Sequence, residues 1–273
     1  MTIYYLRCIL AKQFMFVGKS KNMKISIVTP VYNGEKFIRR TMDSIHSQKG
    51  DFELEHIVCD GESTDRTLEI LKDYPQAKVI SRKDGGPFNA INYGMNLATG
   101  EIGAWLNADD IYLPGTLAKV AAYFEKHKKC QWLYGNCPII NADDQEIRKP
   151  ITWYKEFIGF FYSRNVLLCE NFINQPATFW RMQLWRDMGG LKSLYKAAWD
   201  YELWLKMSAK APACHLHCDL AAFRRHEESI SENFYEKQFA EELQIASEHG
   251  NALHKAIHKF NQWKIVTAYK LLS

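Results

Sequence analysis

The strongest constraint on the fold is an alternation of short apolar segments with amphipathic ones across the first half of the chain. Apolar runs that end in turn-forming residues predict strands at 24–31, 54–60, 77–81 and 102–106. Segments with apolar residues at helical spacing predict helices at about 35–48, 62–71, 88–97 and 114–128. Strands that alternate with helices over short connections predict an α/β fold with a mostly parallel, doubly wound sheet and helices on both faces.

The last of these strands leads into a polar cluster within Gly100–Gly115, which reads GEIGAWLNADDIYLPG. The carboxyl ends of parallel strands share one edge of the sheet, and open α/β sheets bind ligands at that edge. Because the adjacent carboxylates of Asp109 and Asp110 repel each other, we expect a cation beside them. Oxygen ligands suit Mg²⁺ or Mn²⁺, which proteins often share with the phosphates of a substrate. The alternative is a strand followed by an acidic turn.

The second half of the chain has a looser pattern, above all from Gly135 to Phe172. Strands are expected at 130–134, 175–180 and 216–223, and helices from 181 and from about 200, so that Asp200 caps a helix or lies in its first turn. Residues 141–144 are expected to form a solvated turn rather than a second metal site. The aromatic segment 157–162 is expected in the core, with a surface that meets sugar or lipid as the alternative. His226 fits either a ligand or a surface histidine.

Both ends of the chain stand apart from this pattern. Residues 232–273 predict a helical, amphipathic and basic tail that packs on the core or forms a homo-oligomer, with contact to an anionic membrane as the alternative. Residues 1–23 are treated as an extension, because Met23 could start the natural chain. The net charge of +4 is too small to indicate nucleic acid, and no apolar run reaches the length of a membrane-spanning helix.

The cysteines are odd in number and irregular in spacing, which predicts reduced thiols in a cytoplasmic protein. They are Cys8, Cys59, Cys130, Cys137, Cys169, Cys214 and Cys218. The segment Cys214-His215-Leu216-His217-Cys218 holds zinc-type ligands. On a strand, however, its cysteines would share one face and its histidines the other, so we do not expect them to converge on one ion.

Several well-known ligand motifs are absent from the sequence. No G-x-G-x-x-G follows the first strand, which argues against dinucleotide binding, and no G-x-x-x-x-G-K-[ST] marks a P-loop. The G-x-S-x-G motif that would indicate a hydrolase is also absent. The remaining candidates are the polar residues at strand ends, Tyr32, Asp60 and Asp109.

Six segments in order resemble glycosyltransferase family 2, the inverting enzymes of the A-type glycosyltransferase fold. They are ISIVTPVYNG, VCDGESTDRT, DGGPFNAINYGMNLATGEIGAWLNADD, QPATFWR, WDYELWL and FRRHEESIS, within residues 24–231. The chain is most similar to the bacterial enzymes that build surface polysaccharide or lipopolysaccharide. The resemblance implies a nucleotide-sugar donor, often UDP-linked, held by 24–134, and a glycan or lipid-linked glycan acceptor held by 135–231.

The resemblance also implies roles for residues of the donor half. The turn that faces the base is matched by Thr29, Pro30 and Tyr32, and the acid that reads the base ring by Asp60. A loop near the phosphates and ribose is matched by Arg82 and Asp84, with Asn89 on the helix that follows.

The segment Asn107-Ala108-Asp109 occupies the family's D-x-D position. Asp109 would then bind the metal that bridges the diphosphate. Asn107 replaces the usual first aspartate; an amide can still bond a ribose hydroxyl but brings less charge to the metal, which Asp110 could compensate. His226 matches a histidine that in some relatives approaches the metal or the diphosphate.

Asp200 matches the family's catalytic base, with Glu202 as the alternative. A carboxylate there would remove the proton of an acceptor hydroxyl as its oxygen attacks the anomeric carbon, and attack opposite the diphosphate inverts the configuration. A helix N-terminus would favour the ionised form of Asp200. Metal and nearby donors would stabilise the charge that grows on the leaving diphosphate.

Two other classes of function remain open at this point. A nucleotide-sugar-binding protein without catalysis would accommodate Asn107, although the presence of Asp200 argues against it. A nucleotidyltransferase would open with a glycine-rich, basic loop after the first strand, where this chain has Pro30-Val31-Tyr32-Asn33. We expect a cytoplasmic protein, with a peripheral position at the inner face of a membrane, through its tail, as the alternative.

Overall fold

The computed structural model describes residues 22–192, 194–227 and 235–272. Apart from its last two residues, the extension predicted at 1–23 lies outside the described residues.

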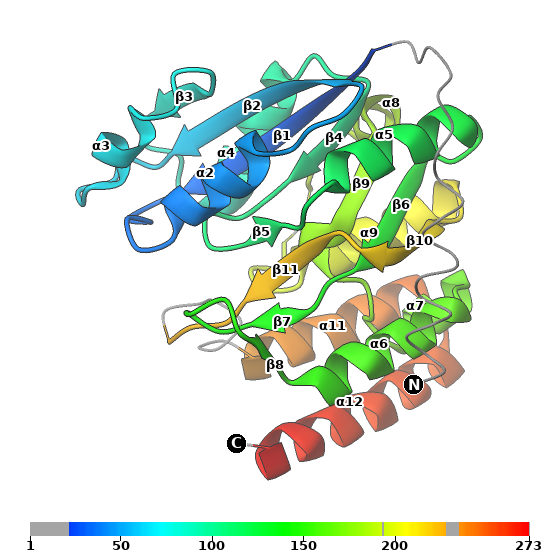
Figure 1. Cartoon of the computed structure of the whole chain (residues 1–273). Helices are drawn as coiled ribbons and strands as arrows, with labels where there is room; N and C mark the ends of the chain where they lie inside the picture. The colour runs from blue at the N-terminus through cyan, green and yellow to red at the C-terminus, as the bar shows by residue number, and fades with distance from the viewer. Residues whose placement is uncertain (1–21, 193, 228–234, 273) are drawn as a thin grey trace, which may run out of the picture.

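A seven-stranded sheet forms the centre of the fold, in the order β10-β6-β9-β4-β1-β2-β3 (Figure 1). Its strands are β1 (Met23–Val31), β2 (Phe52–Asp60), β3 (Lys78–Ser81), β4 (Ile102–Trp105), β6 (Trp132–Asn136), β9 (Thr178–Arg181) and β10 (Cys214–Asp219). Strands β3, β2, β1 and β4 are parallel neighbours, as are β6 and β10, whereas β9 runs antiparallel between β4 and β6. The prediction of a mostly parallel α/β sheet is confirmed.

Helices cover both faces of this sheet. They are α2 (Ile38–His46), α3 (Thr67–Leu71), α4 (Pro87–Leu97), α5 (Thr116–Lys126), α6 (Lys149–Phe160), α7 (Arg164–Cys169), α8 (Met182–Met188), α9 (Trp199–Lys210), α11 (Tyr235–His249) and α12 (Ala252–Leu272), with a short 3₁₀ turn, η2 (Gln175–Ala177). On one face α4 and α9 share a buried cluster that includes Ile91 and Trp204. On the other face α5 buries Leu117 and Phe124.

A second, smaller sheet lies beside the first, in the order β5-β11-β7-β8. Its strands are β5 (Ile111–Tyr112), β7 (Ile139–Ile140), β8 (Glu146–Ile147) and β11 (Ala221–Arg224). The single strand predicted at 216–223 is therefore wrong, since the chain leaves β10 at Asp219 and joins the other sheet as β11. The change happens at Leu220, whose N–H donates to the carbonyl of Asn136 at 3.0 Å and whose carbonyl accepts the hydroxyl of Thr116.

Stacked tryptophans fix α9 against the large sheet. The ring of Trp204 lies between Trp105 of β4 and Trp132 of β6, with ring centroids 5.9 and 5.8 Å away. Trp180 of β9 packs on Trp105 at 5.4 Å, and all four rings are buried. Aromatic pairs of this kind add about 0.5–1.5 kcal/mol each beyond the area that they bury. They hold the start of α9, which carries Asp200, near the carboxyl end of β4.

The tail packs on the core as helices α11 and α12, below the sheet in Figure 1. The imidazole of His258 bonds the carbonyl of Leu168 at 3.0 Å, and Asn261 donates to the carbonyl of Cys169 at 3.1 Å. The carboxylate of Glu241 accepts the backbone N–H groups of residues 196–198, just before α9. The prediction of a packed helical tail is confirmed, and oligomerisation stays a prediction.

Two predictions about the second half are wrong. The aromatic segment 157–162 is mostly not core: Ile158 and Tyr162 pack against the buried cluster, but Phe157, Phe160 and Phe161 are about 60% exposed. The thiols are not all reduced, because Cys130 and Cys214 form a disulfide. They precede and begin the neighbouring strands β6 and β10, which brings their Cα atoms to 6.3 Å.

Two other predictions about this half hold. Residues 141–144 form a turn in which the side chain of Asn141 accepts the N–H groups of Asp143 and Gln145. Along β10, Cys214 and Cys218 pack into one cluster, whereas His217 stacks on Phe160 outside it.

Candidate active site

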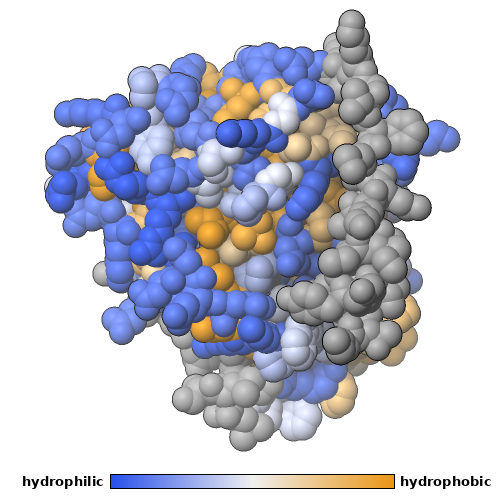
Figure 2. Space-filling view, viewed as in Figure 1, coloured by the Kyte–Doolittle hydropathy of each residue, from blue (hydrophilic) through white to orange (hydrophobic). Residues whose placement is uncertain are grey.

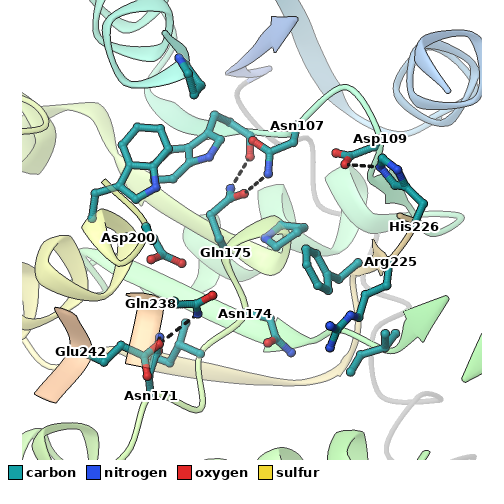
Figure 3. Close-up of a pocket in the computed structure, with 18 of the residues that line it drawn as sticks. Asn107, Asp109, Asn171, Asn174, Gln175, Asp200, Arg225, His226, Gln238 and Glu242 are labelled. Carbon is teal, nitrogen blue, oxygen red and sulfur yellow. Dashed lines mark hydrogen bonds and ion pairs between the residues drawn. The ribbon is translucent and has the colours of Figure 1, made fainter. Parts of the chain in front are cut away.

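A cavity of about 1260 Å³ opens at the carboxyl ends of β1 and β4. The sheet edge forms one wall, and residues of α6, α9, α11 and α12 form the opposite wall. Figure 3 shows Asp109 and His226 on one side of this cavity, and Asp200, Glu242 and Asn171 on the other. Over the front of the molecule, Figure 2 shows mostly hydrophilic side chains around an apolar area near the middle.

Five residues predicted on the donor side line the cavity. They are Pro30, Tyr32, Asp84, Asn107 and Ala108. A carboxylate oxygen of Asp84 accepts the N–H of Gly86 at 2.7 Å, which shapes the loop before α4. Gly85 and Gly86 have φ of +75° and +120°, a region that L side chains rarely adopt. Glycine at both positions therefore lets this loop turn beside the cavity.

Four residues predicted on the donor side do not line it. Thr29 lies in the core, where its hydroxyl bonds His56 at 2.9 Å, because neighbouring residues of β1 point to opposite faces of the sheet. Asp60 is buried and accepts the hydroxyl of Ser81 at 2.5 Å and the N–H of Ser63. The guanidinium of Arg82 lies 4.3 Å from the ring centre of Tyr93. The remaining one is Asn89, an exposed residue of α4.

Asp109 and His226 meet across the small sheet, although 117 residues separate them. Asp109 follows β4, His226 follows β11, and a carboxylate oxygen of the first lies 3.1 Å from Nε2 of the second. A carboxylate suits Mg²⁺ or Mn²⁺, and such sites take their remaining ligands from substrate phosphates and water. Within the described ranges no three His, Cys, Asp or Glu side chains gather as a metal cluster, so this pair is the protein's candidate contribution there.

Asp110 does not fit the predicted role of metal ligand. It is fully buried, and its carboxylate accepts the backbone N–H of Arg224 at 2.8 Å and the amide of Asn107 at 3.3 Å. Burial, together with the charge of Asp109, raises the pKa of Asp110 well above its usual value. Asp110 therefore connects the loop after β4 to β11 instead of facing the cavity.

The side chain of Arg224 completes that connection. It is fully buried; its Nε donates to the carbonyl of Asp109 at 2.7 Å, and Nη1 donates to the carbonyl of Asn141 at 2.8 Å. Its Nη2 pairs with Asp144 at 2.5 Å. Three segments are thus held together behind Asp109.

Asn107 is held in place by Gln175, a residue without a predicted role. The Asn107 amide donates to Oε1 of Gln175 at 3.2 Å, and the Gln175 amide donates to the carbonyl of Trp105 at 2.7 Å. Gln175 is the first residue of the QPATFWR segment, and its place in that family segment is the signal that could have identified it from the sequence.

Asp200 lies in the first turn of α9 and lines the cavity. Burial, with a smaller contribution from the charge of Glu242, raises the pKa of Asp200 to about 6. The backbone N–H of Tyr201 donates to Asp200 at 2.8 Å and lowers its pKa, as expected at a helix N-terminus, but burial outweighs this contribution. A carboxylate with this pKa is mostly ionised at pH 7 and is basic enough to accept a proton.

Glu202, the alternative base, does not line the cavity. Its carboxylate pairs with Lys206 one turn later at 2.8 Å, and only 11% of its side chain is exposed.

Polar residues that the sequence reasoning did not identify surround Asp200. Glu242 of α11 is buried and accepts the amides of Asn171 at 2.9 Å and Gln238 at 3.1 Å. Lys155 of α6 donates to Asn174 at 2.8 Å. These residues come from the loosely patterned region and from the tail, where no motif marks them. We call Asn171, Gln238 and Glu242 the acceptor wall.

A sheet of this order, with an acidic loop at its carboxyl edge facing a carboxylate on a helix, defines a glycosyltransferase of the A-type fold. The chain belongs to glycosyl transferase family 2, whose family model matches residues 26–185. That match ends before α9, so the helices that carry Asp200 and Glu242 lie beyond it. Among the described helices, none is both long and apolar enough to cross a membrane.

Known proteins resemble the chain over most of its length. A PGL/p-HBAD biosynthesis glycosyltransferase of Mycobacterium tuberculosis is 29% identical over 234 residues, which are 82% of this chain and 86% of the relative. A chondroitin synthase of Pasteurella multocida is 27% identical over 71% of this chain, which is only 20% of that protein.

Solved structures share the fold. TarS 1–349 of S. aureus, in complex with UDP-GlcNAc, superposes with a TM-score of 0.63 at 23% identity and covers 83% of this chain and 71% of its own. The mannosyltransferase PcManGT of Pyrobaculum calidifontis, in complex with GDP-Man and Mn²⁺, has a TM-score of 0.63 at 17% identity, over 89% of this chain and 70% of its own.

Proposed function

We propose that the protein is an inverting, metal-dependent glycosyltransferase that moves a sugar from a UDP-sugar to a hydroxyl of a cell-surface glycan or lipid-linked glycan. The observation that carries this proposal is one cavity with Asp109 and His226 on one wall and Asp200 on the other. Inversion requires a base across from the leaving diphosphate, and the positions of these residues in Figure 3 support assigning the two roles to the two walls.

In the proposed reaction Asp200 takes the proton of the acceptor hydroxyl while the oxygen attacks the anomeric carbon. The acceptor wall offers amide and carboxylate groups that can orient neighbouring hydroxyls of the acceptor sugar. The donor diphosphate lies toward Asp109 and His226, which would hold Mg²⁺ or Mn²⁺. When bound, the metal would supply positive charge to the leaving diphosphate.

The choice of donor and acceptor rests on the relatives. TarS is described in complex with UDP-GlcNAc, which supports a UDP-linked donor, although PcManGT is described with GDP-Man. The mycobacterial relative is named for PGL biosynthesis and the Pasteurella one for chondroitin, which supports a surface glycan or glycolipid as acceptor. Cytoplasmic location at the inner face of a membrane is part of the same proposal.

Replacement of Asp109 by Asn tests the donor site. Loss of one charge-assisted contact is worth about 1.5–3 kcal/mol, so we expect about 10–100-fold weaker UDP binding in the presence of Mn²⁺. Calorimetric titration of UDP, GDP and dTDP, each with and without Mn²⁺, measures this. Asp143→Asn, at an exposed turn, is the matched control and should bind as the parent does. Equal affinity with and without Mn²⁺ in the parent protein would rule out the metal role.

The pH dependence of transfer tests Asp200. Its pKa is raised to about 6, so the basic form is lost as the pH falls through that value. We therefore expect kcat/KM to be level above about pH 7 and to fall about tenfold per pH unit well below 6. A rate profile from pH 5 to 8, with UDP affinity measured at each pH, checks this. A rate that is unchanged down to pH 5 would exclude Asp200 as the base.

A further inference from the structure

Two neighbouring helices carry most of the large apolar side chains that the described part of the chain exposes. On and just after α6 these are Trp153, Phe157, Phe160 and Phe161, and on α12 they are Leu253, Ile257, Phe260 and Trp263. Their exposed fractions run from 38% to 67%, and only Tyr32 and Leu194 are comparable elsewhere in the described ranges. Exposed apolar groups in such a cluster mark an interaction surface.

The two sets form one continuous surface. Within each helix the exposed residues recur at intervals of three or four, which places them in a stripe. The stripes meet where Nζ of Lys264 lies 5.6 Å from the ring centre of Tyr154 in α6 and 5.4 Å from that of Phe260 in α12. Figure 1 shows α6 and α12 next to each other in the lower part of the molecule, and α6 is the one that packs on β6 and β10 of the large sheet. We call this surface the α6–α12 face.

The charges beside this face are almost all positive. Among its described side chains, helix α12 has Lys255, Lys259 and Lys264 and no Asp or Glu. Lys255 and Lys259 are exposed, whereas Lys149 of α6 pairs with Glu146 at 3.5 Å and α6 carries one acid, Glu156. An apolar stripe bordered by lysines is the pattern of helices that lie in the headgroup region of anionic membranes. A second copy of the chain on this face would bring like charges together, which disfavours a dimer.

We propose that the α6–α12 face docks on an anionic lipid bilayer. The aromatic side chains enter the headgroup region while the lysines contact anionic headgroups. The same two helices also line the cavity through Tyr154, Lys155 and Ile265, so docking sets the acceptor side of the cavity close to the membrane. This last consequence rests on the proposed function: a lipid-linked acceptor would reach Asp200 from the bilayer surface.

Vesicle sedimentation of the full chain tests the proposal. The vesicles are phosphatidylcholine alone and phosphatidylcholine mixed with phosphatidylglycerol. We expect binding to the mixed vesicles that weakens with salt, and at least tenfold weaker binding for Phe160→Ser combined with Trp263→Ser. Lys255→Glu combined with Lys259→Glu should weaken binding similarly. Leu194→Ser removes an apolar residue that is 98% exposed outside this face and should bind as the parent does.

UDP titration of every variant shows whether the fold and the donor site are intact, independently of vesicle binding. Failure of the parent to bind the mixed vesicles, equal binding to both vesicle types, or parental binding by both double variants would overturn the proposal. If equilibrium sedimentation shows a dimer that Phe160→Ser with Trp263→Ser dissociates, and vesicles are not bound, the face joins two copies instead. If the parent protein does not bind UDP, the proposed function is contradicted, whereas the vesicle result still decides whether the face docks on membranes.

Discussion

Asp200→Asn should reduce sugar transfer by about 10²–10⁴-fold, the usual contribution of a positioned general base, while UDP binds with parental affinity. Asparagine keeps the shape of the side chain, and its N–H groups cannot accept the proton of the acceptor hydroxyl. Release of UDP from a UDP-sugar, with and without acceptor, measures the effect. UDP affinity in the presence of Mn²⁺ checks the donor site.

Unfolding would not explain such a loss. Burial raises the pKa of Asp200 to about 6, so the ionised group destabilises the folded state at pH values above its unfolded-state pKa. Asparagine removes that charge, so the denaturation midpoint of the Asp200→Asn variant at pH 7 should not be lower than that of the parent protein.

The control is Glu202→Gln, which changes a residue of the same helix outside the cavity and should transfer sugar normally. Parental activity in Asp200→Asn, or loss of activity in Glu202→Gln, would move the base to another residue. Parental UDP binding without any transfer by the parent protein would favour the non-catalytic alternative.

Only those site residues could be predicted that lie in a local periodic pattern or in a segment that resembles the family. Strand periodicity placed Tyr32 and Asp109 at the carboxyl edge of a parallel sheet, because the end of a strand is a local signal. His226 and Asp200 were found through the family segments that contain them. Their approach to the cavity depends on the small sheet and on the stacked tryptophans, which no local pattern shows.

The parts that could not be predicted depend on which way a side chain faces. Thr29 is next to a cavity residue and Asp110 is next to Asp109, and both point into the protein. Whether one of two adjacent side chains faces the cavity or the core depends on the pleat of the strand and on the packing around it. The acceptor wall joins Asn171 to Glu242, 71 residues apart, through helix packing. Residue type alone predicts the aromatic segment 157–162 in the core, yet its three phenylalanines face outward.

Arg224→Met should lower the free energy of unfolding by about 1–3 kcal/mol. The side chain is fully buried and donates to the carbonyls of Asp109 and Asn141. Methionine fills much of the space but removes the donor to the Asp109 carbonyl, whereas the Asn141 carbonyl keeps the N–H of Asp144 at 3.2 Å. Each buried acceptor that loses its donor costs about 1–3 kcal/mol. Urea denaturation followed by circular dichroism measures the change. Arg186→Met, at an exposed position of α8, is the matched control and should change stability by less than about 0.5 kcal/mol.

The same substitution should weaken UDP binding in the presence of Mn²⁺ even where the protein remains folded, because Arg224 holds the backbone of the residue that we assign to the metal. Asp144→Asn separates the two contributions of Arg224. It removes the charge from the ion pairs of Asp144 with Arg224 and with Arg40, and it leaves both hydrogen bonds from Arg224 to carbonyls in place. Asp144 is 45% exposed, so the loss should be no more than about 1 kcal/mol, with parental UDP affinity. A large effect of Asp144→Asn would show that the ion pairs of Asp144, and not the two carbonyl contacts, hold the loop of Asp109 against β11.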